Sequence, residues 1–346
     1  MRRLVTLLAV LAVLAACSNV TPVDHTGAPR TVTLLTHDSF DVSKSVLRAF
    51  ERQTGIQVTI LPTGDAGQAV NRAILTAGNP EGDVLFGIDD NLLQQGLDAG
   101  LFEAYASPRL AAVPPGYQLD PEHRVTPVDR GDVCVNADLK AFAGTDAPRT
   151  LDDLPAFASD LVVENPATST PGLAFLLATI ARYGDPGWKD YWTRLRDGGV
   201  KVVDGWERAY FGEFSGAGGG EGTHPLVVSY ATSPVAEVVF AETPIDRAPT
   251  AVLTDTCYRQ IEFAGILRGT EHRAEAEALI DFLLSEPFQE DVPLKMFVYP
   301  VARDAVLPAV FTENATAAPD PMSLDPATVA AHREAWVAAW TDLMLR

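Results

Sequence analysis

The sequence predicts an α/β protein of two lobes, each with a mostly parallel sheet flanked by helices. Residues 31–61 show a strand, an amphipathic helix and a second strand with short connections, which indicates a parallel pair with a right-handed crossover. Residues 83–105 repeat the strand and helix, and a second such series begins near residue 150. The chain has 346 residues, of which 47% are hydrophobic and 21% charged, so it can form two buried cores.

Hydrophobic periodicity and glycines predict where the elements lie. Val42, Val46, Ala49 and Phe50 share one face of the first helix, which Gly55 ends. Later strands are expected within 161–166, 200–205 and 257–269, a strand-turn-helix at 225–242, and helices at 172–184, 188–199, 274–285 and 326–345. In such folds a ligand binds beyond the carboxyl ends of the strands, so we expect a cleft there.

The N-terminus carries the marks of export. Arg2 and Arg3 precede an apolar stretch, 4–16, that is too short to span a bilayer and fits a signal peptide. The following Cys17 completes a stretch, LAAC, that resembles the bacterial lipobox, so we expect a signal peptide over 1–16 and a lipidated Cys17. Residues 17–30 then form a polar tether, and two acyl chains hold the protein at the outer face of the cytoplasmic membrane. An ordinary signal peptide followed by an incidental cysteine is the alternative.

The other two cysteines, Cys134 and Cys257, both lie in strand-like stretches. Outside the cell two such cysteines are expected to pair, here as a bridge between neighbouring strands. Two separately buried thiols are the alternative.

Charge and motifs exclude several classes of function. The net charge of −20 disfavours nucleic acid as a partner and favours cationic small molecules. The sequence contains no G-x-x-x-x-G-K-[ST], H-E-x-x-H or C-x-x-C, and the glycines of 216–222 fit a surface loop rather than a nucleotide-binding turn. His37, Asp38 and Ser39 are adjacent in an extended segment, so they point to alternate faces and cannot form a catalytic triad. We therefore expect no catalytic residues, no metal and no cofactor.

The predicted strand-to-helix junctions share a composition of aromatic rings, hydroxyls and a few carboxylates. Aromatic faces attract a flat cation, a carboxylate pairs its charge, and a helix entrance offers hydroxyl and N–H groups to a polar tail. These residues suit a flat organic cation. The junctions are His37–Phe40, Gly64–Gly67, Thr168–Thr170, Gly205–Trp206, Tyr230–Ser233 and Phe297–Tyr299.

Across essentially its whole mature length, the chain resembles the thiamine-binding subunit of bacterial thiamine ABC importers. The resemblance rests on DSF (38–40), NR (71–72), DVLFGIDDNLL (83–93), TSTPGL (168–173), GWERAY (205–210), SYATSP (229–234), YPVA (299–302) and REAWVAAW (333–340). It implies a class II periplasmic binding protein, a monomer that captures thiamine or its phosphates and delivers them to an ABC permease. The implied lobes are 31–132 plus 256–298, and 133–255 plus 299–346.

The resemblance also implies a set of binding residues. Three positions depart from the family pattern: Ala66 stands where a glycine is usual, His37 where tyrosine is frequent, and Phe297 where tryptophan is frequent. At the helix entrance, one hydroxyl of Thr168, Ser169 and Thr170 is expected to cap the helix and another to face the ligand. The implied binding residues are His37, Asp65, Ala66, Ser169, Trp206, Ser229, Tyr230, Thr232 and Phe297.

Two other functions remain open on sequence grounds. The same fold could bind ferric iron, a polyamine or another cation, although the SYATSP stretch offers Tyr230 rather than a pair of tyrosines for iron. A thiaminase-like enzyme on this scaffold would need a cleft cysteine, for which Cys134 is the candidate. Its neighbours Val133 and Val135 favour a buried or bonded sulfur instead.

Overall fold

The computed structural model describes residues 30–217 and 222–346. The predicted signal peptide at 1–16, the predicted lipid attachment at Cys17 and the tether up to residue 29 lie outside the described residues. Most of the glycine patch at 216–222 also lies outside them. Among the described residues, no helix combines the length and the apolar character needed to cross a bilayer.

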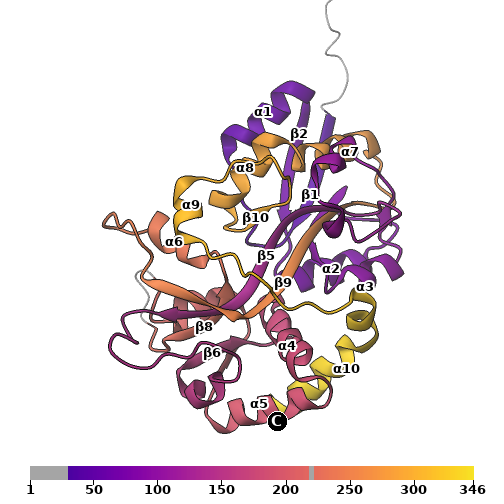
Figure 1. The fold of residues 1–346 in the computed structure, drawn as a ribbon. Coiled ribbons are helices and arrows are strands. Elements are labelled where there is room, and N and C mark those ends of the chain that lie inside the picture. Colours follow the sequence, from indigo (N-terminus) through magenta and orange to yellow (C-terminus); the bar gives the residue numbers. More distant parts are fainter. Residues whose placement is uncertain (1–29, 218–221) are drawn as a thin grey trace, which may run out of the picture.

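One continuous mixed sheet runs through the whole described chain. Its strands are β1 (Arg30–Thr36), β2 (Ile56–Pro62), β3 (Val84–Asp89), β4 (Phe102–Glu103), β5 (Thr126–Asp138), β6 (Leu161–Glu164), β7 (Lys201–Val203), β8 (Leu226–Tyr230), β9 (Thr250–Leu267) and β10 (Tyr299–Pro300). Their order is β2-β1-β3-β9-β5-β8-β6-β7, with β10 beside β5 and β4 beside β9. The sheet positions two groups of helices at its two ends (Figure 1).

Most of the helices correspond to predicted ones, whereas α8 and α9 were not predicted. They are α1 (Lys44–Thr54), α2 (Ala66–Leu75), α3 (Leu93–Asp98), α4 (Thr170–Tyr183), α5 (Gly187–Asp197), α6 (Ser233–Val239), α7 (Arg273–Leu283), α8 (Glu286–Lys295), α9 (Ala309–Asn314) and α10 (Pro326–Leu345). The described chain also contains the 3₁₀-helices η1 (Pro108–Ala112), η2 (Pro115–Tyr117) and η3 (Leu154–Asp160), and the π-helix η4 (Arg208–Glu213).

Two parallel ladders mark the two lobes. In the first lobe β1 pairs in parallel with β2 and β3, and in the second β6 pairs in parallel with β7 and β8. Figure 1 shows α1, α7 and α8 around the first ladder and α4 and α5 around the second. The predicted β-α-β unit is confirmed, and α1 ends as predicted at Gly55, whose φ of 70° is the left-handed conformation that glycine adopts freely.

Two long crossing strands join the sheets of the two lobes into one. The long strands β5 and β9 pair antiparallel between the two parallel ladders. Because β5 and β9 lie side by side, their backbone N–H and C=O groups form hydrogen bonds with each other. The sheet therefore continues from one lobe into the next. The predicted lobe boundaries after residues 132 and 255 fall inside these two strands.

A disulfide joins the two crossing strands. Cys134 of β5 and Cys257 of β9 are bonded, with Cα atoms 4.1 Å apart, as the sequence predicts for neighbouring strands. The bridge lies where the β5–β9 register shifts between Val133 and Val135, and both sulfurs are buried. The alternative of two free buried thiols is therefore wrong.

Large aromatic side chains pack in the core of the second lobe. Phe175 of α4 packs edge-on against Trp192 of α5, and Trp192 packs in the same way against Trp340 of α10. Helix α10 packs on α5 and also reaches α3 of the first lobe, where Arg333 donates a hydrogen bond to Gln95. The last helix thus contacts both lobes.

Candidate functional site

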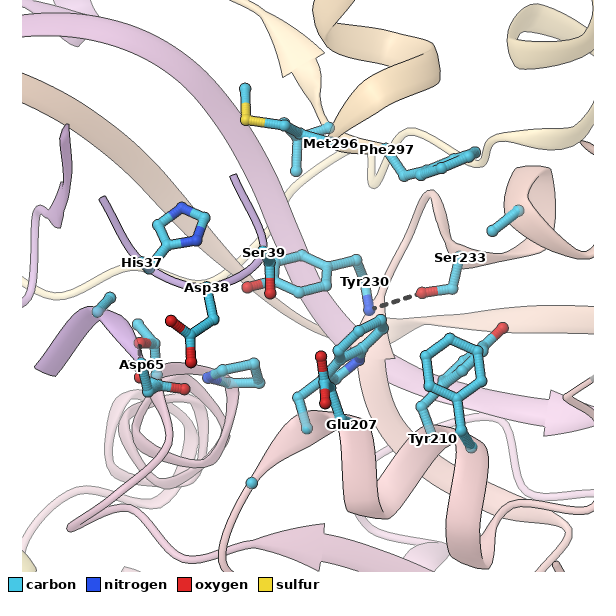
Figure 2. A pocket seen from close by; sticks show the side chains of 18 of the residues that line it. His37, Asp38, Ser39, Asp65, Glu207, Tyr210, Tyr230, Ser233, Met296 and Phe297 are labelled. Atoms are coloured by element: carbon cyan, nitrogen blue, oxygen red, sulfur yellow. Dashed lines mark hydrogen bonds between the residues drawn. The ribbon is translucent and has the colours of Figure 1, made fainter. Parts of the chain in front are cut away.

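A cavity of about 550 Å³ lies between the two lobes at the carboxyl ends of their parallel strands. The first lobe supplies the ends of β1 and α2, and the second supplies the entrance of α4, the segment 205–211 and α6. The crossing strand β9 and residues 295–298 after α8 close the remaining sides. In Figure 2, His37, Asp38 and Asp65 lie on one side, Glu207 and Tyr210 on another, and Tyr230 between them.

His37 follows β1 directly and its ring packs against β3. The imidazole lies 5.4 Å from the ring of Phe86, measured between centroids. Beside Phe86, Gly87 has a φ of 97°, and a Cβ at this position would overlap the imidazole. The glycine therefore leaves the space in which the His37 ring is held.

Asp65 links the two sides of the cleft. It is the N-cap of α2, where its carboxylate accepts from the N–H of Gly67 at 3.4 Å. The same carboxylate oxygen accepts from the hydroxyl of Thr170, at the first turn of α4 in the second lobe, at 3.1 Å. Burial raises the pKa of Asp65 above its usual value, although these two hydrogen bonds lower it in part.

Aromatic rings form the wall on the second lobe. Trp206 stacks on Tyr210 at 5.3 Å between centroids and lies 6.5 Å from Tyr230 at an interplanar angle of 67°. The indole N–H of Trp206 donates to Ser229 Oγ at 2.8 Å, and Ser229 in turn bonds to Ser233 at 2.7 Å. This chain of hydrogen bonds fixes the tryptophan ring at the cavity surface.

The turn after α8 supplies a further apolar edge. Phe297 lies at a φ of 53°, which is uncommon for a residue with a side chain. Its carbonyl accepts a short hydrogen bond from the hydroxyl of Thr232, and its ring lies 5.3 Å from that of Phe240. Met296 and Phe297 lie together on one side of the cavity in Figure 2.

Charge at the cavity is concentrated where His37 meets Glu262 of β9. His37 Nε2 is 3.7 Å from Glu262 Oε2, and both side chains are mostly buried. Burial alone would lower the pKa of His37, but the charge of Glu262, with smaller contributions from Asp65 and Asp38, raises it. In return, His37 lowers the pKa of Glu262 against the effect of burial.

The structure brings six of the nine predicted binding residues to this cavity: His37, Asp65, Ala66, Trp206, Tyr230 and Phe297. The other three lie behind the surface of the cavity. Ser169 caps α4 through the N–H of Gly172 and is 3% exposed, while Ser229 and Thr232 hold Trp206 and Phe297 through the hydrogen bonds described above. At the α4 entrance it is Thr170 that reaches the cavity, and Thr168 bonds to the carbonyl of Asp204.

Several lining residues are not among the nine predicted binding residues. Some lie next to predicted ones and could have been found by extending the same motifs by a residue or two, whereas Glu262 lies in the middle of a strand that nothing in the sequence marks as a cavity wall. Of these lining residues, Asp38, Ser39, Thr170, Gly205, Ser233 and Val298 lie within the predicted strand-to-helix junctions, and those outside the junctions are Pro171, Glu207, Arg208, Tyr210, Phe211, Ala236, Phe240, Glu262, Lys295 and Met296.

The arrangement fits a ligand that is flat and positively charged. The cavity volume is in the usual range for small-molecule sites, which is roughly 300–1,000 Å³. Its aromatic walls can stack on a ring, and Asp65 and Glu262 can pair with a positive charge. Over the described residues, no group of three histidines, cysteines or carboxylates is arranged to hold a metal ion.

Comparison with known proteins shows the family to which the chain is similar. The family model of bacterial extracellular solute-binding proteins matches residues 79–320. A thiamine-binding periplasmic protein of Salmonella typhimurium is 31% identical over 324 residues, covering 91% of this chain and 94% of that protein. The solved structure of a periplasmic thiamin binding protein has a TM-score of 0.79 at 28% identity, covering 91% of this chain and 96% of that one.

A more distant likeness concerns the fold alone. Iron-bound HitA from Pseudomonas aeruginosa has a TM-score of 0.71 at 20% identity, with 92% of this chain and 100% of that chain covered. Together the structural neighbours confirm the predicted two-lobed class II periplasmic binding protein fold.

Proposed function

This chain belongs to the bacterial extracellular solute-binding proteins, and from that premise we propose that it captures thiamine and delivers it to an ABC permease. Thiamine monophosphate and diphosphate are included as candidate ligands. Support comes from a relative, named as thiamine-binding, that is 31% identical over nine-tenths of the chain.

One structural observation carries the proposal: Trp206, Tyr230 and Asp65 line the same cavity although they come from different lobes. Thiamine consists of an aminopyrimidine and a permanently positive thiazolium ring with a hydroxyethyl tail. The two aromatic residues offer faces on which either ring can stack, at about 0.5–2 kcal/mol for a cation over an aromatic face. Asp65 offers a carboxylate to the exocyclic amine or to the positive ring.

We expect binding without chemistry. An enzymatic role would need a nucleophile in the cleft, and the cysteine considered for it, Cys134, is bonded to Cys257 and fully buried. A disulfide sulfur carries no thiolate that could attack the ligand. Incubating the protein with thiamine and an added amine nucleophile should release no thiazole.

The proposal includes a lipid anchor at Cys17, a monomeric state, and two lobes formed by 31–132 plus 256–298 and by 133–255 plus 299–346. The anchor is supported by Arg2 and Arg3, by the short apolar stretch 4–16 and by the cysteine that follows it. In a bacterial host, Cys17→Ser should release the protein from the membrane fraction, and mass spectrometry of the wild-type N-terminal peptide should show the diacylglyceryl adduct. An unmodified cysteine would contradict the anchor.

The test of the ligand begins with the protein as purified from cells. Mass spectrometry of small molecules released on denaturation should find thiamine or a thiamine phosphate. Titration calorimetry of the stripped protein with thiamine, thiamine monophosphate, spermidine and ferric citrate then ranks the ligands. Tight binding of thiamine supports the proposal, while binding of spermidine or iron in its place would move the function to another cation.

A further inference from the structure

Glu262 occupies an unusual place for a carboxylate. It lies in the interior of the crossing strand β9, lines the cavity, and its side chain is 14% exposed. His37 lies beside it, but the Nε2–Oε2 separation of 3.7 Å is too long for a hydrogen bond. His37 Nε2 is buried and has no hydrogen-bond partner within the described structure. The two side chains are close enough for electrostatic attraction but do not form a hydrogen bond.

The strands on both sides of β9 place further acids against Glu262. Asp129 of β5 and Asp89 of β3 are its direct cross-strand partners, and both are fully buried. Burial, together with the charge of Glu262, raises the pKa of Asp129 well above its usual value, which favours its neutral form. Burial raises the pKa of Asp89 to about 6, but its carboxylate is already satisfied by Asn91, Gln260 and the N–H of Leu92.

The remaining charged groups near His37 leave Glu262 as its main partner. From α2 and the loop after β1, Asp65 and Asp38 contribute less to the pKa of His37 than Glu262 does. From β8, the phenol of Tyr230 is neutral because burial raises its pKa well above the usual value.

The two cationic side chains of the cavity are paired with acids outside its lining. Lys295 binds Asp41 at 3.0 Å, and Arg208 binds Glu213 at 2.9 Å. Neither Asp41 nor Glu213 lines the cavity. Among the described side chains that line the cavity, His37 is therefore the one that can place a positive charge against Glu262, when its imidazole is protonated.

We propose that Glu262 is the counter-charge for the positive ring of the ligand, and that the bound cation replaces the proton on His37. The inference rests on the proposed function, because it requires a cationic ligand. Burying an unpaired carboxylate costs free energy. Glu262 is therefore expected to have a positive charge beside it both before and after the ligand binds. When the ligand cation enters, His37 gives its proton to solvent, so the local charge is unchanged.

This exchange has two consequences. It makes the cleft selective for a permanent cation over a neutral molecule of the same shape, because only the cation can replace the charge on His37. It also makes binding release protons, up to one for each ligand. By linkage, affinity must then fall as the pH is lowered, because the proton competes with the ligand.

Calorimetry can test both consequences with two probes. The first is thiamine, and the second is an isostere in which neutral thiophene replaces the thiazolium ring. Titrations near pH 7 in phosphate and in Tris, whose ionisation enthalpies differ, count the protons released. We expect a measurable fraction of one proton released with thiamine and none with the isostere. Glu262→Gln should weaken thiamine binding on the order of 100-fold and leave the isostere nearly unaffected.

Two further variants make the test decisive. Glu334→Gln removes one negative charge from an exposed site on α10 and controls for the overall field of the acidic protein. If Glu262→Gln fails to fold, as thermal unfolding would show, His37→Phe takes its place. We expect His37→Phe to abolish proton release while thiamine still binds.

The outcomes separate this inference from the proposed function. Thiamine binding by the wild type without proton release, or unchanged thiamine affinity in Glu262→Gln, would overturn the exchange and leave the proposed function standing. Absence of thiamine binding by the wild type would overturn both.

Discussion

The ring of His37 lies in the space that a side chain on Gly87 would occupy. A Cβ built on Gly87 overlaps the imidazole Cδ2, and the φ of 97° at Gly87 is one that other residues rarely adopt. Gly87 of β3 therefore sets the position of His37, which follows the neighbouring strand β1.

Gly87→Ala should both strain the backbone and displace His37. We expect a loss of unfolding free energy of about 1–3 kcal/mol, and weaker thiamine binding because the displaced ring enters the cavity. Chemical denaturation and calorimetry measure the two effects. Gly55→Ala is the matched control: its φ is 70° but nothing lies within 4 Å of the added Cβ, so it should cost stability and leave affinity unchanged. Equal affinity losses in both variants would refute the role of Gly87.

The entrance of α4 allows a direct comparison of two neighbouring hydroxyls. Ser169 caps the helix from a buried position, whereas Thr170 reaches Asp65 across the cleft. Ser169→Ala should lower the unfolding free energy by about 1 kcal/mol, with a smaller change in affinity than Thr170→Val causes. Thr170→Val should weaken thiamine binding several-fold, and more at lower pH, because losing this hydrogen bond lets the already raised pKa of Asp65 rise further. The opposite ranking would restore Ser169 as the ligand contact that the sequence predicts.

Local signals explain why much of the fold could be predicted and part of the site could not. Short stretches of sequence contain the apolar spacing before Gly55 and the strand-like surroundings of Cys134 and Cys257. The structure confirms the helix that ends at Gly55 and the disulfide between the two cysteines. Helix α8 was missed because Pro293 lies inside it. Glu262 was missed because its role depends on His37, which is distant in sequence and meets it only through the order of strands in the sheet.

The disulfide between the crossing strands should stabilise the protein strongly. It joins residues 123 positions apart, so replacing both cysteines with serine should lower the unfolding free energy by about 2–5 kcal/mol in denaturant titrations. Thiol counting of the denatured, unreduced protein should detect neither Cys134 nor Cys257, and both should react after reduction. A reactive thiol at Cys134 in the unreduced protein would reopen the enzymatic alternative.

The hydrogen bond from Trp206 to Ser229 should matter for ligand binding although Ser229 does not line the cavity. Trp206→Ala should weaken thiamine binding by about 0.5–2 kcal/mol, the usual range for a cation over an aromatic ring. Ser229→Ala should have a smaller effect in the same direction, because the indole N–H loses its acceptor and the ring is held less firmly. Trp206→Phe removes the N–H, so adding Ser229→Ala to this variant should weaken thiamine binding less than Ser229→Ala does in the wild type. If the losses of binding free energy in the two single variants simply add in the double variant, this coupling is contradicted.

The ion pair of His37 and Glu262 should make the stability of the ligand-free protein depend on pH. The folded-state pKa of His37 is raised above its unfolded value of about 6.5, so the stabilisation is fully present below that value and is lost as pH rises through the folded pKa. The difference in unfolding free energy between wild type and His37→Phe should therefore shrink from pH 6 toward alkaline pH. Glu262→Gln should remove this dependence, because Glu262 is the main cause of the raised pKa, whereas replacing the exposed His332 of α10 with Phe should preserve it. A difference that is constant across this pH range would show that His37 is uncharged in the empty cleft.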